Sequence, residues 1–84
     1  MERKIRQLMA EIFEVDVNKL PESFNQQDVE NWDSLRHLSL IVELESAFGI
    51  SFEPEEISKM NSFQSVIKFT KEKLPVEVKR DNSI

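Results

Sequence analysis

The sequence lacks cysteine and tyrosine, and its 84 residues include only one glycine and one histidine. Without cysteine the chain forms no disulfide and no thiolate metal site, and it has no cysteine nucleophile. A single glycine cannot supply a glycine-rich phosphate loop. No apolar run approaches the ~20 residues of a membrane span, and no apolar signal region follows the charged N-terminus. We therefore expect a cytoplasmic protein without membrane insertion.

Acidic residues outnumber basic ones, sixteen to eleven, which gives a formal net charge of −5. Because nucleic-acid phosphates bind surfaces rich in Lys and Arg, we expect no nucleic-acid partner. An acidic surface favours partner proteins with basic patches, since complementary fields speed encounter. Solubility alone is the simpler explanation of the same charge. No His or Cys cluster has ligand spacing, so no metal site is predicted.

The spacing of apolar residues predicts a first helix over residues 2–13, followed by a long loop. One face of that helix gathers residues at i, i+3, i+4, i+7 and i+8. Between residues 15 and 32 the helical period disappears, but isolated apolar anchors indicate an ordered loop. The helix-face residues are Ile5, Leu8, Met9, Ile12 and Phe13, and the loop anchors are Val15, Val17, Leu20, Phe24, Val29 and Trp32.

A second helix is predicted from Asp33-Ser34 to Phe48, with Asp33 as N-cap and Gly49 in the terminating position that tolerates positive φ. A short helix follows from Pro54. The last begins near Asn61 or Ser62, with Asn61 and Gln64 as a capping pair, and ends before Pro75. The prediction is an all-α four-helix bundle of three longer helices, a short third helix and a long first loop. Residues 1–75 form one domain and residues 76–84 a flexible tail.

The second helix is wider in apolar residues than a core stripe requires. His37, Leu38, Leu40, Ile41, Leu44 and Phe48 share one broad face at about 100° per residue. Leu35 and Val42 lie together at its margin. Excess apolar width on an acidic protein indicates a surface for contacts with partners.

Ser34 is the candidate for chemistry. Asp33, Ser34 and His37 supply the residue types of a hydrolytic triad, but Ser34 and His37 are one helical turn apart. That spacing leaves no independent scaffold for an oxyanion hole, so we expect no catalysis by the chain itself. His37 is better interpreted as a helix-face residue. The simplest interpretation of Asp-Ser before an apolar run is an N-cap.

The run Trp32-Asp33-Ser34-Leu35, at the end of the long loop, resembles the attachment motif of the phosphopantetheine-dependent carrier proteins, the acyl carrier protein family. The resemblance extends from about Ile5 to Leu74. It includes the segment 43–50, which closes on Phe-Gly-Ile, and the segment 62–67 in the fourth helix. It implies a carrier, not an enzyme, within the four-helix bundle already expected.

By this resemblance, Ser34, flanked by Asp33 and Leu35, carries covalent 4'-phosphopantetheine donated by coenzyme A. The positive end of the helix dipole would stabilise the phosphodiester. The implied partners are a phosphopantetheinyl transferase and the enzymes that load, transfer or condense acyl groups, and a monomer suits such a shuttle. The expected partner contacts are Leu35, Arg36, Val42, Glu43, Glu53, Glu55 and Glu56.

The sequence departs from fatty-acid carriers at two positions. Asn31 stands where they usually have glycine, and Arg36 where they usually have an acidic residue. Arg36 makes the second helix less acidic than usual, which indicates a dedicated set of enzymes in a specialised pathway.

The sequence leaves several functions open. The first is a carrier of acyl groups for fatty-acid, polyketide or related biosynthesis, and the second is an aminoacyl or peptidyl carrier loaded by an adenylating ligase, a class suggested by Trp32. An unmodified helical interaction module would use Leu35, Leu38 and Val42, and, most distantly, a hydrolase would use Ser34.

Overall fold

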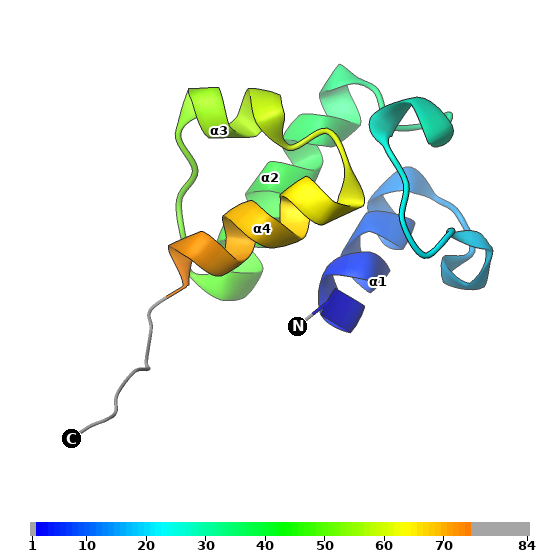
Figure 1. Cartoon of the computed structure of the whole chain (residues 1–84), viewed down its shortest axis with the longest axis horizontal. Coiled ribbons are helices and arrows are strands. Elements are labelled where there is room, and N and C mark those ends of the chain that lie inside the picture. Colours follow the sequence, from blue (N-terminus) through cyan, green and yellow to red (C-terminus); the bar gives the residue numbers. More distant parts are fainter. Residues whose placement is uncertain (1, 75–84) are drawn as a thin grey trace.

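The computed structural model describes residues 2–74, which form four helices joined by one long and two short connections (Figure 1). The helices are α1 (Glu2–Phe13), α2 (Ser34–Phe48), α3 (Pro54–Lys59) and α4 (Phe63–Lys73). Two single-turn 3-10 helices, η1 (Val17–Lys19) and η2 (Gln26–Asp28), lie in the α1–α2 connection. The all-α four-helix architecture is confirmed. None of the helices in this part of the chain has the length and apolar character that crossing a membrane requires. The predicted stop at Pro75 and the predicted tail 76–84 lie outside the described residues.

Helix α1 buries the face that the sequence predicted. Ile5, Met9 and Phe13 are fully buried, at the i, i+4, i+8 spacing of one helix face. Glu14 ends the helix in the left-handed region, with φ of 57°. This is an uncommon conformation for a residue with a side chain, so the turn out of α1 depends on the contacts around it.

Helix α2 begins and ends as its sequence predicts. The Asp33 carboxylate accepts a hydrogen bond of 2.8 Å from the backbone N–H of Arg36. At the other end, Gly49 has φ of 66°, and its N–H donates to the carbonyl of Glu45. Glycine adopts this left-handed conformation without the steric cost that a Cβ brings.

The cap of α4 differs from the prediction. Ser62, not Asn61, is the N-cap, and its Oγ accepts from the backbone N–H of Ser65 at 3.1 Å. The carbonyl of Asn61 instead accepts from the backbone N–H of Gln26 at 2.8 Å, part of an isolated antiparallel bridge between Asn25 and Ser62. Since this pairing keeps the chain extended through Ser62, the helix starts one residue later than an Asn61 cap would allow.

The long connection from α1 to α2 is held by specific contacts along its length (Figure 1, blue to cyan). Arg6 of α1 donates to the carbonyls of Pro21 and Glu22, each at 2.8 Å, and its guanidinium lies 4.5 Å from the centre of the Phe63 ring. Phe24 is buried and stacks on Phe63 with ring centroids 5.2 Å apart. The expectation of an ordered loop with apolar anchors is confirmed, and the loop delivers the chain to the start of α2.

Candidate functional site

Ser34 is the first residue of α2, and its side chain is exposed. Asp33, the N-cap, occupies the N–H of Arg36, but the N–H groups of Ser34 and Leu35 precede the first internal helix bonds. Together with the positive end of the helix dipole, these groups favour negative charge next to the Ser34 hydroxyl. The surroundings of Ser34 therefore fit a phosphodiester formed on its Oγ, a group that needs solvent access and nearby donors.

The ring of His37 is fully engaged by the protein. The indole Nε1 of Trp32 donates to His37 Nδ1 at 2.9 Å, and His37 Nε2 lies 2.8 Å from the carbonyl oxygen of Ile57. Because Trp32 is only a donor and a carbonyl is only an acceptor, these contacts assign the proton to Nε2 of a neutral ring. Neither nitrogen is left to take a proton from Ser34. The geometry of a Ser-His-Asp triad is absent at this position.

Asn31 and Arg36 bind the end of α1. The side-chain amide of Asn31 donates to the carbonyl of Phe13 at 2.7 Å, and Arg36 Nη1 donates to the carbonyl of Ile12 at 2.6 Å. Arg36 Nη1 also lies 3.4 Å from a carboxylate oxygen of Glu14. Carbonyls in the last turn of a helix lack internal partners, so both side chains cap α1. We call this pair of contacts the clasp. The clasp fixes residues on both sides of Ser34 to the C-terminal end of α1.

Three large apolar side chains of α2 lie exposed in a row. Leu35, Leu38 and Val42 are 74%, 56% and 60% exposed, respectively. With Ser39 and Glu43 they line a shallow groove of about 260 Å³. Leu35 and Val42 lie outside the core, as predicted, but the sequence placed Leu38 on the core face and the structure leaves it largely in solvent. We call Leu35, Leu38 and Val42 the apolar stripe; it starts one residue after Ser34.

The predicted acidic contacts divide into two groups. Glu43, Glu53 and Glu55 are exposed. The carboxylate of Glu56 instead accepts from the backbone N–H of Glu53 at 2.8 Å and lies 3.0 Å from Lys73 Nζ. The hydrogen bond from Glu53 and then that from Lys73 lower the pKa of Glu56, and the bond to Glu56 raises the pKa of Lys73. Among the predicted partner contacts, Arg36 and Glu56 thus have partners within the chain.

Within residues 2–74, no group of three or more His, Cys, Asp or Glu side chains is arranged to hold a metal ion. The residues that sequence reasoning missed belong to the clasp. Asn31 stood out only as a departure from a motif, and Arg36 was predicted to contact partner enzymes, not the end of α1. Their partners are 18 and 24 residues away, and no local pattern connects them.

Comparison with known proteins matches most of this chain. Residues 3–70 match the family model described as "Phosphopantetheine attachment site". The chain is also similar to the acyl carrier protein of Thermosynechococcus vestitus, with 35% identity over 72 residues. That alignment covers 84% of this chain and 88% of the relative.

Proposed function

This chain belongs to the acyl carrier protein family, and we propose that it carries acyl groups as thioesters on a phosphopantetheine arm attached to Ser34. The observation that carries the choice of Ser34 is its exposed hydroxyl at the first position of α2, inside the region matched by the family. The arm supplies the thiol that a chain without cysteine cannot provide.

The residues around Ser34 have distinct tasks in this proposal. Ser34 Oγ loses its proton and bonds to the phosphorus of coenzyme A that bears the pantetheine, and adenosine 3',5'-bisphosphate leaves. Asp33 fixes the first turn of α2 by capping the Arg36 N–H. The free N–H groups of Ser34 and Leu35 then stabilise the negative charge that remains on the phosphodiester.

The partner enzymes, we propose, bind α2 through the apolar stripe. Leu35 begins that stripe immediately after the attachment residue, so an enzyme seated on it has the arm within reach. Exposed Glu43, Glu53 and Glu55 suit an enzyme surface with basic residues around an apolar centre. A carrier needs weak, repeated encounters with several enzymes, and surface charge speeds encounter more than it deepens affinity.

We further propose that the chain serves a dedicated set of enzymes in fatty-acid, polyketide or related biosynthesis. With Arg36, Ser39 and Ser46, the surface of α2 is less acidic than the second helix of a generic fatty-acid carrier. An aminoacyl carrier is the second candidate, and the enzyme that first loads the arm distinguishes the two. An acyltransferase that loads the modified protein favours the first, whereas loading only by an adenylating ligase favours the second.

Intact mass before and after incubation with coenzyme A, magnesium and a broad-specificity phosphopantetheinyl transferase tests the attachment. We expect a gain of one phosphopantetheinyl group in the natural sequence and in Ser46→Ala, and none in Ser34→Ala. Ser46 is a matched control because it is an exposed serine on the same helix. Unchanged mass in a folded sample, beside an active control carrier, would count against this proposal.

A further inference from the structure

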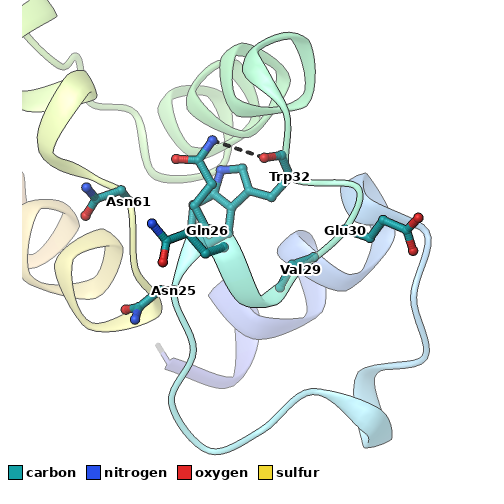
Figure 2. Close-up of a pocket in the computed structure, with 7 residues that line it drawn as sticks. Asn25, Gln26, Val29, Glu30, Trp32 and Asn61 are labelled. Atoms are coloured by element: carbon teal, nitrogen blue, oxygen red, sulfur yellow. Dashed lines mark hydrogen bonds between the residues drawn. The ribbon is translucent and has the colours of Figure 1, made fainter.

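A groove of about 560 Å³ lies between η2 and the residues that precede α4 (Figure 2). Its lining is dominated by side-chain amides, and Val29 and Trp32, which are 7% and 3% exposed, contribute a small apolar part. Glu30 is the one ionisable residue among the lining residues. The amide residues are Asn25, Gln26, Gln27 and Asn61.

Hydrogen bonds hold the backbone around this groove, and most of its amide residues are exposed. Gln26 Nε2 donates to the carbonyl of Trp32 at 3.0 Å, shown as the dashed line in Figure 2. The backbone N–H of Gln26 donates to the carbonyl of Asn61, which holds the two walls together. The residues Asn25, Gln27 and Asn61 are exposed. Each of these three side chains presents an N–H donor and a carbonyl acceptor.

Such a lining selects a particular ligand chemistry. A secondary amide of a ligand also has one N–H donor and one carbonyl acceptor. It can therefore donate to one side-chain amide of the groove and accept from another. The lining has no Lys or Arg to attract an anion, and Glu30 opposes one. The small exposed part of Val29 and Trp32 is apolar and suits aliphatic groups beside the amides. A neutral chain of amides and aliphatic carbons therefore fits the groove better than a charged ligand.

The groove lies close to the attachment residue. Trp32, which lines it, is two residues before Ser34, so their Cα atoms are at most about 7.6 Å apart. The pantetheine arm contains two secondary amides in series, next to a carbon bearing two methyl groups. Two amide units alone span about 7 Å. An arm on Ser34 is thus long enough to place its amides against this groove.

We propose that the groove formed by Asn25, Gln27, Val29, Trp32 and Asn61 binds the amide portion of the chain's own pantetheine arm. The inference rests on the proposed attachment at Ser34. Tethering gives the arm a high local concentration, so even weak hydrogen bonds to exposed amides populate the docked state. Docking would hold the arm along the loop between visits to partner enzymes, on a surface distinct from the apolar stripe.

NMR spectra of the isotopically labelled protein before and after modification test this inference. We expect the side-chain NH₂ signals of Asn25, Gln27 and Asn61 to shift, and nuclear Overhauser contacts from the arm's methyl groups to Val29 and the Trp32 ring. The double variant Gln27→Ala/Asn61→Ala should lose those contacts but still gain the arm by mass. The control Asn18→Ala removes an exposed amide from η1, outside the groove, and should keep them.

The outcomes separate the two claims. A mass gain with shifts confined to the first turn of α2, and no contact from the arm to Val29 or Trp32, overturns the docking and leaves the carrier function standing. Contacts that persist in the double variant overturn the role of the amides. No mass gain overturns the attachment, and the docking with it.

Discussion

Trp32 Nε1 donates to His37 Nδ1 across 2.9 Å, joining the residue two before Ser34 to the residue three after it. The same indole stacks on Phe13 of α1, with ring centroids 4.9 Å apart, and the His37 ring reaches the carbonyl of Ile57 in α3. These contacts tie the first turn of α2 to α1 and α3. The exposed Ser34 therefore lies on a helical turn whose neighbouring side chains, Trp32 and His37, are held by contacts with α1 and α3.

Replacing His37 by Phe tests that this ring is structural rather than catalytic. The variant leaves the buried Trp32 Nε1 without its acceptor, and the Ile57 carbonyl keeps only the hydrogen bond from the backbone N–H of Met60. We expect a loss of about 1–3 kcal/mol in the free energy of unfolding, measured by urea denaturation. Modification of Ser34 should continue at a temperature where the variant is folded. Its abolition in a folded variant would mean that His37 takes part in the reaction.

The clasp predicts an energetic cost for removing Arg36. In Arg36→Gln the carbonyl of Ile12 loses a charged donor, so we expect destabilisation of about 1–3 kcal/mol in urea. Arg36→Asp should be worse, because it places a carboxylate near Glu14 and the same carbonyl. The control Arg3→Gln changes an exposed arginine of α1 and should lie within about 0.5 kcal/mol of the natural sequence. Equal stability of Arg36→Gln and Arg3→Gln would contradict the clasp.

A charge placed in the apolar stripe should affect partners and not the fold. Val42→Asp changes an exposed residue, so we expect a change in stability within about 0.5 kcal/mol. The transferase or loading enzyme should turn over the variant at least several-fold more slowly at limiting carrier concentration. Ala47→Asp, which adds the same charge at another exposed position of α2, should retain the rate. Equal rates for the two variants would show that the stripe is not the contact surface.

The Glu56–Lys73 pair predicts a pH dependence of stability. The pKa of Glu56 is lowered in the folded chain, so its contribution is present above its ordinary value of 4.5 and is lost as pH falls through the folded-state pKa. Glu56→Gln should therefore flatten the decline of stability in this acidic window, as followed by thermal denaturation. Glu55→Gln, at an exposed neighbour, should retain the decline. Indistinguishable pH profiles for the two variants would refute the contribution of the pair.

The sequence predicted the features that depend on neighbouring residues. Asp33 and Gly49 bounded α2 correctly because capping acts within a turn or two of its own residue. The Ser62 cap was missed since it depends on the pairing of Asn61 with Gln26, far away in the chain. Periodicity also put Leu38 on the core face, because it does not tell how far neighbouring elements cover a helix.

Mapping the modified residue tests the central claim most directly. After modification with coenzyme A and the transferase, the protein is digested and the peptide containing Ser34 is fragmented in a tandem mass spectrometer. The carrier account predicts the phosphopantetheinyl group on that peptide alone, assigned to Ser34, with a free thiol that accepts an acyl group. An arm on another serine, or a modified protein whose thiol accepts no acyl or aminoacyl group from any loading enzyme, would contradict it.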